Sequence, residues 1–232
     1  MENKETVLVT GGSGFIGSHC IIQLAAAGYN VKATVRDLSR TNKLNQILLT
    51  GLEKHEGKSD LSVDWQVANL SSDEGWDEAV KGCDYVLHVA SPIGMELPKN
   101  EDEMVKPAVE GTLRVLEAAS KAGVKRVVIT SSVAAIMYGT DKQGVFNEED
   151  WTDPKSRTTN VYAKSKTLAE QAAWDFIKKD TTGMELSTVL PAMVFGPILE
   201  EDFGVSVGAI LDMMNGKYPI VPNWDMGVVD VR

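Results

Sequence analysis

The feature that most constrains the fold is a glycine-rich turn close to the N-terminus. An apolar run over residues 6–10 has the length of a buried strand, and residues 14–27 place apolar side chains at helical spacing. The turn between them reads as G-x-x-G-x-x-G from Gly11 or as G-x-G-x-x-G from Gly12. Glycines let the backbone approach a pyrophosphate closely, and the helix N-terminus offers free N–H groups to the anion. The unit therefore predicts a dinucleotide site whose contacts come from the turn: Gly11, Ser13, Gly14, Phe15, Ile16 and Gly17.

The rest of the chain alternates short apolar runs with longer amphipathic stretches. The alternation predicts strands over 31–35, 63–67, 85–90, 126–130 and 186–190, helices over 42–49, 72–80, 104–122 and 161–179, and loops over 51–60 and 139–160. Strands separated by helices imply βαβ units, so the fold class is α/β, a doubly wound parallel sheet of the Rossmann type. An apolar stretch over 204–214 suits a helix that lines an apolar pocket and equally a helix packed in the core.

Charge and composition argue against several classes of partner. The net charge is −10, which disfavours binding to nucleic acid or to an anionic membrane. The one basic cluster, Arg36, Arg40 and Lys43, is too small for a nucleic-acid face. Cys20 and Cys83 lie in apolar segments typical of buried free thiols. Without a signal-like start or a bilayer-length apolar run, we expect a cytoplasmic protein, and the residue pattern indicates no metal site.

The end of the second predicted strand bears on the choice between NADP and NAD. An acidic residue there binds the ribose 2′-hydroxyl of NAD, whereas an arginine accommodates the 2′-phosphate of NADP. The strand ends in Arg36 followed by Asp37, so Arg36 predicts NADP(H), with Lys43 or Arg40 as a second cation. The competing interpretation is that Arg36 is solvated and Asp37 takes the ribose, and the adjacent aspartate keeps dual specificity open.

A tyrosine and a lysine open the helix predicted over 161–179. Tyr162 and Lys166 are four residues apart and therefore share one helix face. A nearby ammonium stabilises a phenolate, so Lys166 is expected to lower the pKa of Tyr162 from its ordinary value of about 10. The preceding strand ends in Ser131 and Ser132, at the sheet edge where α/β proteins bind ligands. One serine there can donate a hydrogen bond to a carbonyl oxygen, and the other is expected only to cap the strand end.

Together these segments resemble the extended short-chain dehydrogenase/reductase superfamily (the NAD-dependent epimerase/dehydratase family). Within it, the chain is similar to the dihydroflavonol 4-reductase, cinnamoyl-CoA reductase and aldehyde reductase group. The resemblance covers nearly the whole chain. It rests on ordered blocks at 9–17, 33–37, 88–92 (HVASP), 109–113 (VEGTL), 130–132, 162–166 and 191–197 (PAMVFGP).

The resemblance implies roles for residues in most of these blocks. Tyr162 would protonate a carbonyl oxygen as hydride arrives, Lys166 would hold the nicotinamide ribose, and Ser132 would orient the carbonyl. His88 would pack under the cofactor without a catalytic role. Further cofactor contacts would come from the ends of the later strands: Val89, Ala90, Ser91, Thr130, Pro191 and Val194.

The chain departs from the family pattern in two places. Many relatives carry Asp-Leu after the third strand, where the acid contacts the adenine, and this chain carries Asn69 and Leu70. An asparagine can still hydrogen-bond adenine, so both positions are retained as cofactor contacts. Relatives also continue beyond residue 232. We therefore expect an NADP-binding domain with the catalytic residues over 1–190, and a small, incomplete substrate lobe over 191–232.

The favoured function is an NADPH-dependent reductase of a small aldehyde or ketone. A nucleotide-sugar epimerase or dehydratase that retains NAD is the alternative enzyme, and Arg36 argues against it. A non-catalytic NADP-binding sensor is the alternative outside the enzymes, and the retained Tyr162 and Lys166 argue against it. The helices over 104–122 and 161–179 could pair across a twofold axis in a homodimer, or their apolar stripes could face the sheet.

Overall fold

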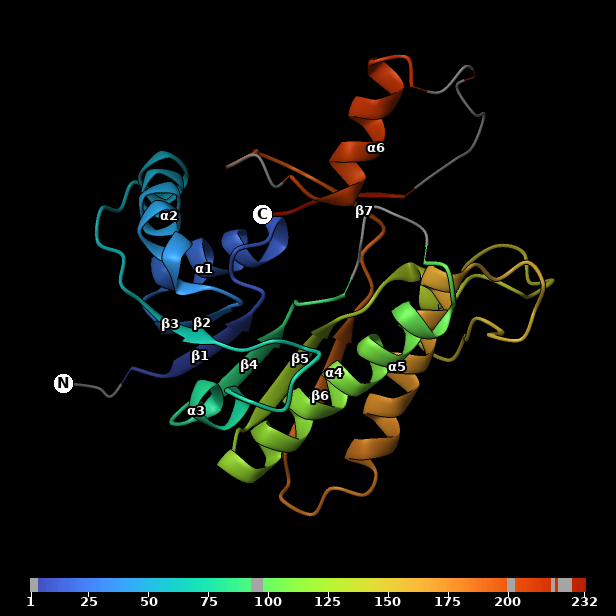
Figure 1. The fold of residues 1–232 in the computed structure, drawn as a ribbon, viewed down its shortest axis with the longest axis horizontal. Helices are drawn as coiled ribbons and strands as arrows, with labels where there is room; N and C mark the ends of the chain where they lie inside the picture. The colour runs from blue at the N-terminus through green and yellow to red at the C-terminus, as the bar shows by residue number, and fades with distance from the viewer. Residues whose placement is uncertain (1–3, 93–97, 200–202, 218–219, 221–226) are drawn as a thin grey trace.

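The structure is a computed structural model that describes residues 4–92, 98–199, 203–217, 220 and 227–232. Among them a six-stranded parallel sheet runs in the order β3-β2-β1-β4-β5-β6 (Figure 1). This order confirms the doubly wound α/β fold that the alternation predicts. The strands are β1 (Thr6–Thr10), β2 (Asn30–Val35), β3 (Val63–Val67), β4 (Tyr85–His88), β5 (Arg126–Thr130) and β6 (Glu185–Val189).

Helices cover both faces of the sheet (Figure 1). One apolar core joins the sheet to α3, α4 and α5, and a second joins it to α1 and α2. Neighbouring residues of β1 divide between these cores, because alternate side chains of a strand point to opposite faces: Leu8 belongs to the first and Val9 to the second. The helices are α1 (Phe15–Ala27), α2 (Thr41–Glu56), α3 (Trp76–Val80), α4 (Asp102–Ala122) and α5 (Val161–Ile177), with short 3-10 turns η1 (Leu38–Arg40) and η2 (Val133–Ala135).

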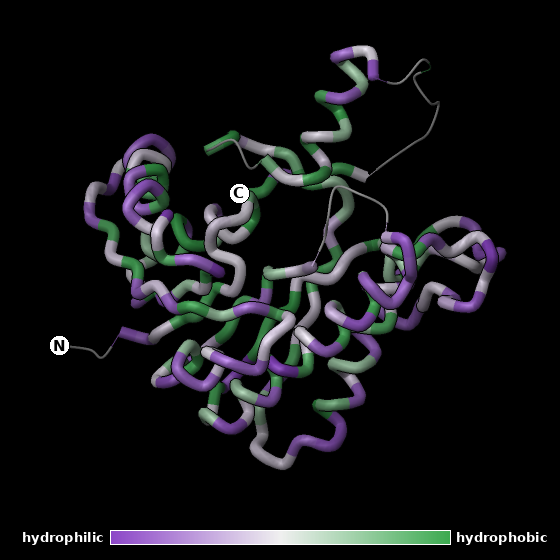
Figure 2. Tube along the Cα trace, in the orientation of Figure 1, coloured by the Kyte–Doolittle hydropathy of each residue, from purple (hydrophilic) through white to green (hydrophobic). Residues whose placement is uncertain are grey.

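Hydropathy follows this layering. In Figure 2 the hydrophobic segments gather along the central strands, and the hydrophilic ones lie on the outer turns of the helices and in the loops. Leu8, Val86 and Val127 on three adjacent strands are fully buried. Near-continuous apolar strands of this kind are expected where a parallel sheet is covered on both faces.

A small lobe lies above the carboxyl ends of the strands (Figure 1). It contains α6 (Gly204–Met214) and a two-stranded parallel ribbon of β7 (Met193–Phe195) and β8 (Val228–Asp230). The sequence analysis predicted neither strand, because three residues are too few to show a period. The lobe touches α1 where His19 hydrogen-bonds the carbonyl of Pro197 at 3.0 Å.

The prediction of a loop over 51–60 is wrong in its first half. Helix α2 continues to Glu56 and ends at Gly57, whose φ of +64° is the left-handed conformation of a helix cap. Gly51 lies inside the helix because α2 crosses α1 closely there: a Cβ at this position would lie 2.6 Å from the Cδ1 of Ile22. Leu48 and Leu52 continue the buried stripe across the glycine.

Other boundaries move by a few residues. Strand β4 ends at His88, so Val89 and Ala90 leave the sheet earlier than predicted. The helix predicted over 72–80 begins only at Trp76, and the helix predicted from residue 104 begins at Asp102. Residues 139–160 contain no helix or strand, as predicted. The sequence also predicts that a loop over 93–100 helps to shape a substrate pocket, and residues 93–97 of it lie outside the described residues.

Candidate active site

The glycine turn bends around the end of β4. Gly11 has a φ of +69°, and a Cβ there would lie 3.0 Å from the Cα of Ala90. Its N–H donates to the hydroxyl of Thr34 in β2 at 3.0 Å. Gly17 lies so close to the carbonyl of Gly11 that a larger residue would force the turn apart. These positions need glycine for close backbone packing, which is the physical reason for the motif.

The N-terminus of α1 is open toward the same space. The residue that precedes the helix is Gly14, so no side chain caps the first N–H groups. Unpartnered N–H groups at a helix N-terminus, together with the helix dipole, favour an anion. The turn therefore has the features of a binding site for the pyrophosphate of a dinucleotide.

A buried polar pair fixes the chain after β4. The Thr10 hydroxyl lies 2.9 Å from His88 Nδ1 and accepts a hydrogen bond from the N–H of Ala90 at 3.0 Å. Burial, and then the charge of Lys166, lower the pKa of His88 to about 3. The imidazole is therefore neutral at physiological pH. Its place in this pair fits the packing role expected of His88.

The two charged residues that follow β2, Arg36 and Asp37, have different surroundings. Arg36 is exposed and lines the cavity described below, and in the described part of the chain it makes no hydrogen bond or ion pair. The Asp37 carboxylate instead accepts hydrogen bonds from the Ser39 N–H at 2.9 Å and from the Ser39 hydroxyl, and both lower its pKa. Asp37 is thereby held as the cap of η1. Lys43, the expected second cation, is exposed on α2 and does not line the cavity.

The tyrosine and lysine are placed by the start of α5. The side chain of Asn160 caps this helix by accepting the N–H of Ala163 at 2.8 Å. Tyr162 follows in the first turn, hydrogen-bonded to the side chain of Ser132. Lys166 is buried one turn later, and its ammonium donates to the carbonyl of Thr130 at 3.2 Å.

The two serines after β5 have separate partners. The Ser132 hydroxyl accepts the N–H of Ala134 at 3.2 Å and faces Tyr162. The Ser131 hydroxyl donates to the buried carboxylate of Glu170 on α5. The structure thus assigns the position beside the tyrosine to Ser132 and a supporting contact to Ser131. Glu170 was missed by the sequence analysis, since a glutamate one turn after Lys166 gives no sign that it is buried.

The expected effect of Lys166 on the tyrosine pKa is wrong for this structure. Burial raises the pKa of Tyr162, the hydrogen bond from Ser132 opposes that rise, and Tyr138 adds to it. Burial also lowers the pKa of Lys166 to about 8, while Glu170 raises it. Burial is the largest cause of the raised pKa of Tyr162, and the ammonium of Lys166 donates to the carbonyl of Thr130.

These residues meet in one cavity of about 710 Å³ at the carboxyl ends of the strands. Every predicted site residue except Lys43 lines it. The lining residues that were predicted are Gly11, Ser13, Gly14, Phe15, Ile16, Gly17, Arg36, Asn69, Leu70, Val89, Ala90, Ser91, Thr130, Ser132, Tyr162, Lys166, Pro191 and Val194. The sequence analysis missed others that arrive from distant segments, namely Pro107 of α4 and residues 203–206 at the start of α6. Helix α6 therefore lines the cavity with its first turn, one of the two roles considered for it.

The fold and the cavity define a Rossmann-type protein with a serine, tyrosine and lysine site. The family model of the NAD dependent epimerase/dehydratase family matches residues 7–225. The chain belongs to this family, within the extended short-chain dehydrogenase/reductase superfamily and its group of dihydroflavonol 4-reductase-like and cinnamoyl-CoA reductase-like proteins.

Similar proteins place the chain in that group. Dihydroflavonol 4-reductase of Arabidopsis thaliana is 40% identical over 205 residues, which cover 86% of this chain and 52% of the relative. Cinnamoyl-CoA reductase CAD2 of Medicago truncatula is 38% identical over 232 residues, which cover 97% of this chain and 68% of the relative. The solved yeast methylglyoxal/isovaleraldehyde reductase complexed with NADPH superposes with a TM-score of 0.81 at 28% identity, covering 97% of this chain and 70% of that chain. The chain thus spans only part of the length of its relatives, about half of the first.

Among the described residues, no helix combines the length and the apolar character needed to cross a bilayer.

Proposed function

We propose that the chain is an NADP(H)-dependent oxidoreductase that reduces the carbonyl group of an aldehyde or ketone. The observation that carries the proposal is the convergence of Tyr162, Ser132 and the open N-terminus of α1 on one cavity. A dinucleotide that lies across the cavity would have its pyrophosphate at α1 and its reactive ring beside Tyr162.

NADPH, when bound, supplies the hydride that reduces the carbonyl carbon. Tyr162 gives the proton to the carbonyl oxygen, and its raised pKa keeps that proton on the phenol at neutral pH, which suits the reducing direction. Ser132 steadies the same oxygen with a hydrogen bond as negative charge develops there. Lys166 places a positive charge behind the tyrosine and binds the nicotinamide ribose.

Two features favour NADP over NAD. Arg36 reaches the cavity without a partner among the described residues and is free to bind a 2′-phosphate. Asp37, the residue that would bind the ribose 2′-hydroxyl of NAD, is held by Ser39 and does not line the cavity. The yeast reductase of similar fold was solved with NADPH, which agrees with this choice.

We assign the cofactor and the catalytic residues to a domain over 1–190, and the substrate side to the lobe over 191–232. The support is that Pro191, Val194 and the first turn of α6, all in the lobe, line the cavity. Phe203 and Val205 make that wall apolar, so the carbonyl compound carries an apolar substituent.

The test is the loss of NADPH absorbance with a panel of aldehydes and ketones, run beside NADH, on this chain and on one extended to the length of its relatives. We expect turnover with NADPH and much slower turnover with NADH. Copurified NAD that stays bound would instead favour a nucleotide-sugar epimerase. Tight NADPH binding without any turnover in the extended chain would favour a sensor.

Two further expectations belong to the same proposal. Helices α4 and α5 lie side by side on one face of the sheet, and a homodimer through their outer faces is tested by light scattering (Figure 1). A cytoplasmic location is consistent with Cys20 and Cys83, which are both unpaired, and imaging of a fluorescent fusion tests it.

A further inference from the structure

We propose that Arg114 of α4 is a positioning residue that holds the turn after β3 in the shape that receives the adenine of the dinucleotide. The proposal rests on the proposed function, because it concerns how the same cavity recognises the adenine half of its cofactor. It gives a physical role to the block over 109–113, which the sequence analysis noted without assigning any function to it.

The turn over residues 69–73 forms one wall of the cavity, through Asn69, Leu70 and Ser71. It follows β3, the strand next to β2, and Arg36 comes directly after the last residue of β2. Tyr162 and Ser132 lie at the opposite end of the cavity, beside β5. A dinucleotide with its 2′-phosphate on Arg36 therefore has its adenine half near this turn.

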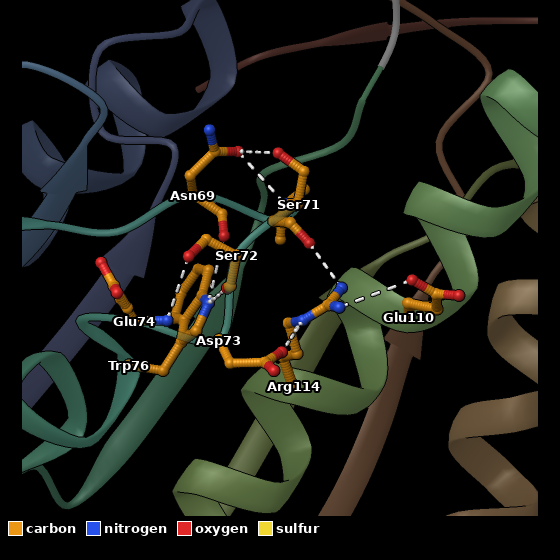
Figure 3. A network of polar contacts seen from close by, with 9 residues as sticks. Asn69, Ser71, Ser72, Asp73, Glu74, Trp76, Glu110 and Arg114 are labelled. Carbon is orange, nitrogen blue, oxygen red and sulfur yellow. Dashed lines mark hydrogen bonds and ion pairs between the residues drawn. The ribbon is translucent and has the colours of Figure 1, made fainter.

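Bonds within the turn support it only in part (Figure 3). The Asn69 side-chain oxygen accepts the N–H and the hydroxyl of Ser71, at 3.1 and 3.0 Å. The indole N–H of Trp76 reaches the carbonyls of Ser72 at 3.0 Å and Asn69 at 3.3 Å. None of these bonds involves the carbonyl of Leu70, the residue at the apex of this wall.

Arg114 supplies the missing contact from a different element (Figure 3). Its Nη1 donates to the carbonyl of Leu70 at 2.9 Å, and its Nε donates to the carboxylate of Asp73. Its Nη2 lies 3.5 Å from Glu110, one turn earlier on α4. One planar guanidinium thus ties both sides of the turn to a long helix, which a lysine could not do with a single ammonium.

Gly111 brings the helix close enough for this contact. A Cβ at Gly111 would lie 2.8 Å from the Cβ of Leu70 and 3.2 Å from its carbonyl oxygen. Gly111 precedes Arg114 by three residues and therefore lies on the same helix face. The hydrogen bond that Arg114 donates to Asp73 raises the pKa of Arg114, so the guanidinium stays charged. Helix α4 therefore holds the turn over residues 69–73 in place, and the shape of the cavity wall that this turn forms depends on α4.

The test compares Arg114→Met, which keeps the apolar stem of the side chain, with Arg126→Met as a matched control. Arg126 is also an ion-paired arginine, bonded to Glu185, but it lies at the amino ends of the strands, away from the cavity. Binding of NADPH is followed by its fluorescence and binding of adenosine 2′,5′-bisphosphate by calorimetry. We expect Arg114→Met to weaken both about tenfold, Arg126→Met to weaken neither, and KM for NADPH to rise with kcat unchanged.

Arg114→Lys and Asp73→Asn serve if Arg114→Met fails to fold, because each keeps part of the contact. Both variants should still bind adenosine 2′,5′-bisphosphate measurably more weakly than the unsubstituted chain does. Their melting temperatures should stay near that of the unsubstituted chain. Unchanged affinity in these variants, or weaker NADPH binding with unchanged binding of the bisphosphate, overturns the proposal. If the unsubstituted chain binds neither ligand, the proposed function itself fails and the inference falls with it.

Discussion

The ammonium of Lys166 donates a hydrogen bond to the carbonyl of Thr130 at 3.2 Å, at the floor of the cavity and almost out of contact with water. A charged lysine in such a place costs stability, because desolvation disfavours its charged form. The same burial makes the lysine sensitive to pH within the range in which enzymes work. The buried charge of Lys166 therefore lowers the stability of the fold, whereas the proposed chemistry needs that charge.

Replacing the lysine should separate these demands. In Lys166→Met we expect the free energy of unfolding at pH 7 to rise by about 1–3 kcal/mol, because no ammonium is buried, while turnover is lost. The unfolded chain binds the lysine proton up to a pKa of about 10.5, and the folded chain only up to about 8. The free energy of unfolding of the unsubstituted chain thus rises between pH 8 and 10.5. The difference in stability between the variant and the unsubstituted chain should therefore shrink in this range. Urea titrations at pH 7 and pH 10 measure the difference, and a less stable variant at pH 7 would contradict this account.

Glu170 should determine the upper pH limit of turnover. Its carboxylate raises the pKa of Lys166, so in Glu170→Gln the lysine loses its proton at lower pH. If turnover needs the ammonium, kcat/KM falls as pH rises through about 8, and in Glu170→Gln this fall should begin at lower pH. Ser131→Ala is the control, since it removes the hydrogen bond to Glu170 and keeps the carboxylate. A pH profile that moves equally in both variants would assign Glu170 a packing role only.

Tyr162→Phe removes the proposed proton donor and little else. The ring remains to fill the wall of the cavity, so NADPH affinity should stay within about twofold of that of the unsubstituted chain, while kcat falls on the order of a hundredfold or more. Fluorescence titration gives the affinity and single-turnover kinetics give the rate. An equally active variant would exclude the tyrosine as the acid.

Arg36→Ala should change the choice of cofactor. A charge-assisted contact to phosphate contributes about 1.5–3 kcal/mol, so Kd for NADPH should rise roughly tenfold to a hundredfold and Kd for NADH should change little. Lys43→Ala is the matched control, because Lys43 lies outside the cavity. Equal weakening of both cofactors in Arg36→Ala would show that Arg36 does not bind the 2′-phosphate.

Two glycines with the same backbone conformation allow strain to be separated from function. Gly11 and Gly28 have φ values of +69° and +92°, and only a Cβ at Gly11 would meet a neighbour, Ala90. Alanine at either position should cost about 1–2 kcal/mol of stability through strain. Only Gly11→Ala should also weaken NADPH binding, because the turn must move away from Ala90. Melting curves with and without NADPH test this prediction. If NADPH raised the melting temperature of Gly11→Ala and of Gly28→Ala by the same amount, the prediction would be refuted.

The sequence gives reliable information wherever the structure depends on neighbours along the chain. The strand and helix on either side of Gly11, and the shared helix face of Tyr162 and Lys166, follow from local periodicity, and the structure has both. The errors have a common cause. A loop was predicted from Gly51 onward, because the packing of Gly51 against Ile22 cannot be seen in the local sequence.

Local sequence also cannot show which of the charged residues belong to the site. The sequence analysis predicted Arg36 as the first cation for the 2′-phosphate and Lys43 or Arg40 as a second, but of Arg36 and Lys43 only Arg36 lines the cavity, since β2 ends there and α2 leads away from it. Glu170 and Arg114 have no distinguishing local pattern either. Their roles depend on Ser131 and Leu70, which lie 39 and 44 residues earlier in the chain.

The sequence by itself determined the class of fold, the glycine turn and the tyrosine–lysine pair, because backbone hydrogen bonding and side-chain periodicity act over a few residues. Tertiary structure alone decided which charges reach the cavity, and that burial rather than Lys166 dominates the pKa of the phenol. These properties depend on desolvation and on contacts between distant segments, and both arise only when the chain is packed.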